Sequence, residues 1–387
     1  MMNRLKIWTD KHIQGDPVIW IVVTLLAFVG ILVVYSATGS LAYRVAGGDT
    51  EKYLLRHSIM VVLSFFVMWV AHKIDYRYYA KITKYALIAS IPLLLYAWLF
   101  GAEVNEARRW IEVPFIGLQF QPSDLAKMAL IAGLATMLAK RQSQIEDIKD
   151  TLIPMLLWSF GICLLIAMTN ISTAVLLFAT CLLLFFIGRV PVKYLAMLVV
   201  VGAFAGLIAM KAGQRGETAV SRVTRFLDKT DVPYQVEQAN IAMATGGILG
   251  KGPGKSTQRN FLPEAYSDYA YAIIIEEYGI IGGVFVLLLY LVLLYRGMRV
   301  VANSDRAFGG LLSAGLTFLI VIQAMVNIGV VVGLGPVTGQ TLPLISMGGT
   351  SLLFTGLSLG IVLSVSRGET EDFAAVGGQL KNRMRTA

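Results

Sequence analysis

A small set of ionisable side chains lies in or beside strongly apolar stretches of this sequence. Asp124 and Lys127 stand in one apolar run with i, i+3 spacing, so on a helix they share a face and can pair. A charge at the centre of a bilayer costs about 2.5–3.5 kcal/mol on insertion scales, so such residues need a partner or a wet cavity. The two residues therefore form either a structural ion pair or part of a cavity that substrate reaches.

A second group of carboxylates surrounds the start of another apolar run. Ser267 and Asp268 end a polar stretch, and Glu276 and Glu277 follow within the run. Ser and Asp are favoured helix caps, because they accept hydrogen bonds from free amides and suit the positive end of the helix dipole. Spacing alone favours this capping role for Asp268 over a catalytic one. Because adjacent helical residues diverge by about 100°, we expect one of the two glutamates to point into the protein.

Paired arginines occur in two polar segments. Arg108 and Arg109 precede Trp110, a pattern typical of interfacial anchoring but also of phosphate recognition, for which the forked guanidinium donors are well suited. Arg222 and Arg225 stand at i, i+3 on a predicted helix and can belong to the same electropositive surface.

The segment from Asn327 to Ser351 is rich in Gly, Pro and hydroxyl residues. Irregular backbone at membrane depth must be buried in protein or line a cavity, so this segment is either a cavity wall or an outer turn. The three histidines, His12, His57 and His72, fit no metal-ligand or catalytic-triad pattern.

These residues belong to an all-α, polytopic membrane protein. Of 387 residues, 56% are hydrophobic and only 15% charged, and the apolar residues fall in blocks long enough for membrane-spanning helices. The net charge of +9 is dispersed among loops, so it indicates membrane topology and no nucleic acid. Cys163 and Cys181 lie inside apolar runs and are interpreted as buried, nonligating residues.

Ten spans are predicted from the apolar blocks. Their ranges are Pro17–Ala37, His57–His72, Tyr85–Gly101, Gln121–Ala139, Leu152–Met168, Ile171–Ile187, Tyr194–Met210, Asp268–Tyr295, Ala307–Val332 and Leu342–Ser366. Loops on the side of the N-terminus carry about 19 Lys and Arg, and the short opposite loops carry about five. Both termini, residues 1–16 and 367–387, are therefore expected in the cytoplasm.

The long segment 211–267 between the seventh and eighth spans is expected on the extracytoplasmic side. It contains two short helical patterns, Ala219–Leu227 and Pro233–Ala244, the second followed by Gly246 and Gly247. No separate soluble domain or fixed-period repeat is evident, so residues 1–387 are predicted to form a single membrane domain.

Four separated motifs resemble the SEDS family (shape, elongation, division and sporulation) of bacterial cell-wall proteins. They are ARRWI at 107–111, FQPSDLAK at 120–127, FLPEAYSD at 261–268 and IGVVVGLGPVTGQTLPLISMGGTSLL at 328–353. The run GKGPGKSTQRNFLPEA looks more like the division-type members than the elongation-type members. The resemblance implies a peptidoglycan glycosyltransferase of the bacterial cytoplasmic (inner) membrane, at the septum if division-type, that polymerises lipid II with a class B penicillin-binding protein as its partner.

The resemblance places the family's essential carboxylate on Asp268, its cavity acid and lysine on Asp124 and Lys127, and its loop arginines on Arg108 and Arg109. With this assignment, capping and catalysis by Asp268 no longer compete, because a cap would hold the carboxylate at the outer membrane surface. Further substrate-binding candidates lie in the same motifs and in the outer helix: Arg222, Arg225, Gln258, Glu264, Thr338 and Ser346.

Three departures from the family pattern bear on these roles. Asp124 stands where Glu is usual, Tyr266-Ser267-Asp268-Tyr269 replaces His-Thr-Asp-Phe, and Asn170 replaces an Asp. No histidine can therefore assist Asp268, and an ionic role at Asn170 is weakened. The sequence indicates no definite cofactor, although a divalent cation, Mg²⁺ or Mn²⁺, beside Asp268 would serve the same chemistry. Three alternatives remain open: an elongation-type polymerase of the same family, a flippase for the lipid-linked precursor, and a noncatalytic scaffold of the division machinery.

Overall fold

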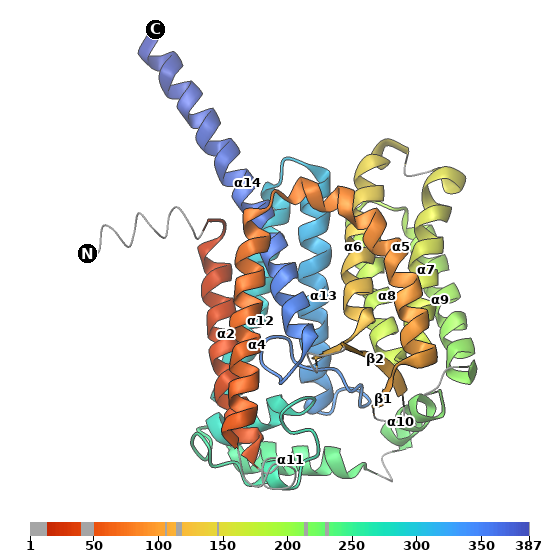
Figure 1. Cartoon of the computed structure of the whole chain (residues 1–387), viewed down its shortest axis with the longest axis vertical. Helices are drawn as coiled ribbons and strands as arrows, with labels where there is room; N and C mark the ends of the chain where they lie inside the picture. The colour runs from red at the N-terminus through yellow and green to blue at the C-terminus, as the bar shows by residue number, and fades with distance from the viewer. Residues whose placement is uncertain are drawn as a thin grey trace.

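The computed structural model describes residues 14–39, 50–104, 107–113, 118–144, 147–212, 216–228 and 232–386. It is a bundle of helices with one small sheet and several short elements gathered at one end (Figure 1). The bundle helices are α2 (Pro17–Ala37), α4 (Thr50–Lys73), α5 (Tyr76–Phe100), α6 (Pro122–Lys140), α7 (Ile153–Ala167), α8 (Ile171–Ile187), α9 (Val192–Ala212), α12 (Ala270–Asn303), α13 (Ala307–Val331) and α14 (Thr350–Thr386).

The ten predicted spans all coincide with helices in the described part of the chain. Eight candidate spans are long and apolar enough to cross a membrane, and Ile171–Ile187 and Val192–Leu207 are shorter apolar helices. The protein is therefore a polytopic, helical membrane protein, as the apolar blocks predicted. For two helices, α2 and α8, the observed first and last residues are the predicted ones.

Several predicted helix starts were wrong. The second and third spans begin earlier, at Thr50 and Tyr76, and Asp75 caps the latter helix by accepting from the Arg77 amide at 2.9 Å. The tenth begins later, at Thr350 instead of Leu342. Leu344 adopts a left-handed backbone conformation with φ 67°, which interrupts any helix between these two residues.

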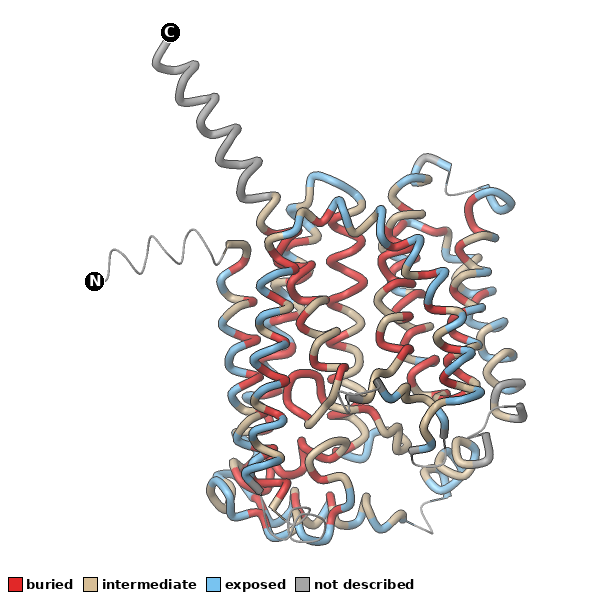
Figure 2. The backbone as a smooth tube through the Cα atoms, viewed as in Figure 1, coloured by how far each residue is buried: buried red, intermediate tan, exposed pale blue. Residues whose placement is uncertain are grey.

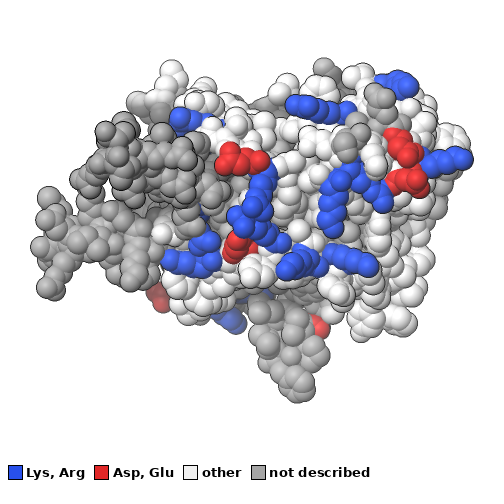
Figure 3. Space-filling model, turned by 90° about the horizontal axis from the view of Figure 1, so that it is seen from above, with Lys and Arg blue, Asp and Glu red and all other residues white. Residues whose placement is uncertain are grey.

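Cations mark one end of the bundle, here called the basic end. There Arg296 pairs with Asp16 before α2, with Nε 2.7 Å from the carboxylate, and Arg367 in α14 donates to the Lys73 carbonyl at 3.1 Å. Figure 3 looks onto this end and shows many more Lys and Arg than Asp and Glu side chains.

The opposite end, here called the site end, carries the non-spanning elements (Figure 1). These are the antiparallel strands β1 (Ala102–Val104), β2 (Ala107–Val113) and β3 (Leu118–Phe120), and the helices α10 (Gly216–Asp228) and α11 (Tyr234–Gly246). The two helices confirm the predicted helical patterns, whereas the sheet was not predicted. Pro233 stands at the N-cap of α11, and Gly247 ends it with φ 57°.

Helix α13 is the centre of the bundle and packs against α6, α8, α12 and α14. Its residues 309–317 are all buried, whereas the outward faces of α4 and α5 are exposed in Figure 2. Those exposed faces are apolar, with Phe66 and Ile82 each more than half exposed, so they suit lipid rather than water.

Candidate active site

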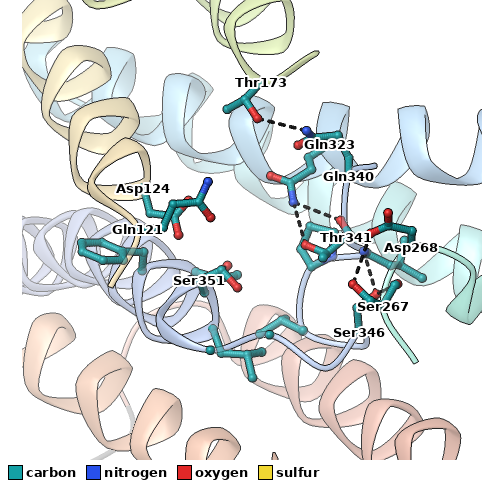
Figure 4. Close-up of a pocket in the computed structure, with 18 of the residues that line it drawn as sticks. Gln121, Asp124, Thr173, Ser267, Asp268, Gln323, Gln340, Thr341, Ser346 and Ser351 are labelled. Atoms are coloured by element: carbon teal, nitrogen blue, oxygen red, sulfur yellow. Dashed lines mark hydrogen bonds between the residues drawn. The ribbon is translucent and has the colours of Figure 1, made fainter. Parts of the chain in front are cut away.

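A polar cavity of about 360 Å³ opens among the motifs identified in the sequence. Its lining comes from β2, the first turns of α6 and α8, helix α13, the loop before α12, the segment between α13 and α14, and the first turns of α14. Figure 4 shows Asp124, Thr173 and Asp268 arranged around this space from three different elements. The Gly- and Pro-rich segment is therefore a cavity wall, which decides between the two interpretations of its sequence.

Amide side chains of α13 hold this wall in place. Asn327 donates to the carbonyls of Asp268 and Gln340 at 2.8 and 2.6 Å, and Gln323 donates to the Thr341 carbonyl at 3.0 Å. Irregular backbone inside a membrane protein needs such partners, since lipid supplies none. Helix α13 thus fixes both the loop that carries Asp268 and the wall opposite it.

Hydroxyl groups make the second set of links. The Ser346 hydroxyl donates to the Ser267 carbonyl at 2.5 Å and accepts from the Leu342 amide at 2.8 Å (Figure 4). The Met347 amide donates to the Tyr266 carbonyl at 2.8 Å. Ser346, predicted to bind substrate, lines the cavity and also positions the residue before Asp268.

Asp268 lies in the cavity lining but does not cap α12, so the predicted capping role was wrong. The N-cap of α12 is Tyr269, and no side-chain cap hydrogen bond is formed there. The Asp268 carboxylate instead accepts from the Ser267 hydroxyl at 3.2 Å. A methyl group placed on Gly339 would lie 3.4 Å from Asp268 Oδ2 and 4.0 Å from Arg222 Nη1, so both charged groups border Gly339.

The predicted pairing of Asp124 with Lys127 is confirmed. Lys127 Nζ lies 2.9 Å from Asp124 Oδ1, and the side chains are only 13% and 6% exposed. Both line the cavity, and Asp124 Oδ2 has no hydrogen-bond partner among the described residues. The pair is thus both an ion pair and part of the polar cavity.

The two neighbouring arginines of β2 take different positions. Arg109 and Trp110 line the cavity. Arg108 points elsewhere: its side chain is 49% exposed, lies 3.7 Å from the Glu103 carboxylate and donates to the Leu99 carbonyl at 3.3 Å.

Of the remaining predicted substrate-binding residues, some lie at the cavity and others do not. Glu264 lines the cavity, and Arg222 borders it by donating to the Val337 carbonyl at 3.2 Å. Arg225, Gln258 and Thr338 are not among the cavity-lining residues, and Gln258 belongs to the loop around Glu276. The structure therefore brings together Asp268, Asp124, Lys127, Arg109, Glu264, Ser346 and, at the edge, Arg222.

Both Glu276 and Glu277 are buried, so the expectation that only one points inward was wrong. Lys251 Nζ lies 2.6 Å from Glu276, which also accepts from the Thr257 amide at 3.0 Å. Glu277 accepts from the Ser256 amide at 3.2 Å and from the Ser36 hydroxyl of α2. The outer loop folds back over this turn of α12 and supplies donors to both carboxylates, with more of them on Glu276 than on Glu277.

Electrostatics at the cavity are dominated by closely spaced acids. Burial and the Asp268 charge raise the pKa of Glu264, and a hydrogen bond from Tyr266 partly offsets this. Burial, with a smaller contribution from the Asp268 charge, raises the pKa of Tyr269 to about 12. The raised pKa values show that added negative charge is unfavourable next to Asp268, while Arg109 and Lys127 supply positive charge elsewhere in the same lining.

The carboxylates do not form a metal centre. Within the described ranges, no three His, Cys, Asp or Glu side chains are grouped so as to hold a metal ion. Asp124 is already engaged by Lys127 at 2.9 Å. The chemistry below is therefore derived from the side chains alone.

Some site residues escaped the sequence reasoning. Gln323, Asn327 and Gln340 organise the cavity wall, and Gln340 also donates to Thr173 at 3.0 Å. The sequence feature that could have identified them is the occurrence of Asn and Gln side chains within the 328–353 motif and just before it. Asn170, which replaces an Asp of the family pattern, lines the cavity and caps α8 by accepting from the Thr173 amide at 3.2 Å.

The fold and the site define a polytopic membrane protein with a charged cavity near one end of its bundle. A family model described as "Cell cycle protein", covering FtsW, RodA and SpoVE, matches residues 16–371. The chain belongs to this family, which confirms the SEDS resemblance.

Individual relatives match over nearly the whole chain. Stage V sporulation protein E of Bacillus subtilis is 34% identical over 93% of this chain and 99% of its own length. A probable peptidoglycan glycosyltransferase FtsW of a Geobacter species is 34% identical over 92% of this chain and 98% of its own. A solved structure described as "Structural coordination of polymerization and crosslinking by a peptidoglycan synthase complex" shares 27% identity, a TM-score of 0.73, and 92% and 98% coverage.

Proposed function

We infer that this protein is a peptidoglycan glycosyltransferase that polymerises lipid II, with the FtsW type favoured by the names of its relatives. The observation that carries the assignment of its site is the presence of Asp268, Arg109 and Lys127 in the lining of one cavity. Transfer with inversion needs one base on the nucleophile and positive charge on the leaving group, and these three residues offer both.

In the proposed reaction, a hydroxyl oxygen of one lipid-linked sugar attacks the anomeric carbon of another. The new glycosidic C–O bond forms as the C–O bond to undecaprenyl pyrophosphate breaks, and Asp268 takes the hydroxyl proton. Arg109 and Lys127 stabilise the leaving diphosphate, because charge-assisted donors favour developing negative charge. The carboxylate is available for this role because its side chain does not cap α12.

The protein is proposed to act in the bacterial cytoplasmic membrane, with the basic end inside and the site end outside. We propose a class B penicillin-binding protein as its partner and the division septum as its location. The solved complex of polymerisation and crosslinking at 27% identity supports such a partner.

The first test measures glycan strands formed from lipid II by the purified protein. Asp268→Asn is expected to lower the rate by about 10²–10⁴-fold, the usual loss of a general base. Asp228→Asn, at an exposed position of α10, is the matched control and should keep wild-type activity. Near-wild-type polymerisation by Asp268→Asn would exclude Asp268 as the base, and no polymer from the wild-type chain would favour the flippase or scaffold.

The second test uses the two adjacent arginines. Arg109→Ala should raise the lipid II concentration needed for half-maximal rate by about tenfold, because a charge-assisted hydrogen bond is worth about 1.5–3 kcal/mol. Arg108→Ala, whose guanidinium lies beside Glu103, should change it little. Equal effects of both substitutions would refute the division of roles between them.

A further inference from the structure

A second cavity of about 280 Å³ adjoins the first. The two share a wall that consists of Trp110, Tyr266, Met347, Gly348 and Gly349. The far side of the second cavity is formed by Arg56, His57, Met60 and Gln119. Its volume is near the lower end of the range for small-molecule sites, about 300–1,000 Å³, and suits a single sugar ring rather than an extended glycan.

His57 is the unusual residue of this cavity. Its side chain is buried, at 1% exposure, and neither ring nitrogen has a hydrogen-bond partner among the described residues. Buried polar groups in native proteins are nearly always paired, so an unpaired imidazole in a cavity lining is available to pair with a molecule that enters the cavity. A buried imidazole is neutral and offers one donor and one acceptor, which matches a hydroxyl or acetamido group.

The charge distribution separates the two cavities. The first is lined by the cations Arg109 and Lys127 together with acids. Among the described residues, Arg56 is the only charged side chain in the lining of the second, and it is exposed. A diphosphate therefore fits the first cavity, and an uncharged sugar fits the second.

The shared wall leads towards Asp268. Tyr266 faces both cavities and stands two residues before Asp268 in the chain, and its carbonyl accepts from the Met347 amide at 2.8 Å. The wall that separates the two cavities thus includes a residue that is two positions from the proposed base.

We propose that the second cavity binds the acceptor sugar of the polymerisation reaction, with His57 hydrogen-bonded to a hydroxyl or acetamido group of that sugar. This inference rests on the proposed glycosyl transfer, in which the acceptor hydroxyl attacks the anomeric carbon, undecaprenyl pyrophosphate leaves and Asp268 receives the proton. His57 binds and orients the acceptor and takes no part in the proton transfer.

The experiment uses two probes that cannot react and the full-length protein in lipid nanodiscs. One probe is the methyl glycoside of the N-acetylated disaccharide, which carries sugars without a diphosphate. The other is undecaprenyl pyrophosphate, which carries the diphosphate without sugars. Dissociation constants are measured for the wild type, His57→Leu, His57→Gln and Ile59→Ala, a control at an exposed position of α4 that lines neither cavity.

His57→Leu is expected to weaken binding of the disaccharide about tenfold, and to leave undecaprenyl pyrophosphate within about twofold of wild type. His57→Gln keeps a donor and an acceptor and should retain most of the affinity, and Ile59→Ala should retain all of it. Unchanged disaccharide binding by His57→Leu, or equal weakening of both probes, would overturn the proposal. Because binding needs no turnover, a wild-type chain that binds both probes and forms no polymer would overturn the proposed function instead.

Discussion

The Asp124–Lys127 pair gives the sharpest test of whether the cavity is functional or only structural. Nζ and Oδ1 are 2.9 Å apart and both side chains are nearly buried. Removing one partner of a buried pair leaves an uncompensated charge and costs about 3–5 kcal/mol, whereas replacing both by apolar residues of similar size is often neutral. We therefore expect Asp124→Leu and Lys127→Met each to lower the unfolding free energy by about 3–5 kcal/mol, and the double variant to lie within about 1 kcal/mol of wild type.

Across the wild type, the two single variants and the double variant, polymerisation activity is expected to change differently from stability. Lys127 lines the cavity in addition to pairing with Asp124. The double variant should thus regain stability without regaining polymerisation, because a site for the diphosphate is lost. Unfolding in mixed micelles and lipid II polymerisation are measured on the same four proteins. Recovery of polymerisation in the double variant would show that the pair is purely structural. If the unfolding free energies of the single variants lie within about 1 kcal/mol of wild type, the predicted energetic coupling between Asp124 and Lys127 is refuted.

Two further predictions concern Gly279, inside α12, and Glu264, in the loop before α12. Gly279 has φ 70° and ψ −174°, and a methyl group there would lie 2.0 Å from the Ile248 carbonyl oxygen, so Gly279→Ala should cost at least about 3 kcal/mol in an unfolding titration. Gly254, with φ 73° and open space around it, is the control, and Gly254→Ala should cost only about 1 kcal/mol; equal losses would contradict the clash. For Glu264, the raised pKa means that the folded state binds more protons than the unfolded state, so stability falls as pH rises through the window above the usual 4.5. Glu264→Gln should remove this fall in melting curves between about pH 4 and about pH 8, whereas Glu112→Gln, at an exposed position of β2, should leave it in place.

Features encoded by neighbouring residues were predictable from the sequence. The apolar run of α8 is bounded by Asn170 and Gly188, which serve as its N-cap and C-cap, and its bounds were correct. The Asp124–Lys127 contact follows from helical spacing alone. The presence of Asp268 and Arg109 in one cavity agrees with the family resemblance, although neither apolar periodicity nor spacing would have brought them together.

Features that depend on distant contacts were not predictable. Whether Ser267 and Asp268 cap α12 depends on Ser346 and Asn327, which hold that loop from other parts of the chain. The burial of both glutamates likewise depends on Ser36 and on the loop at Lys251, far away in sequence. A periodicity argument treats the helix as isolated, and here the surrounding chain decides which faces are buried.

The same long-range contacts explain how a loop can hold the proposed catalytic carboxylate, Asp268, in place. The loop is tied at one end by Glu276, which accepts from amides at Thr257 and Gln258, and at the other by Asn327, which donates to the Asp268 carbonyl. A buried carboxylate is stable only when donors surround it, so these contacts persist only while the loop keeps its conformation. The two glutamates therefore serve the site indirectly: their need for donors fixes one end of the segment that presents Asp268, while α13 fixes the other.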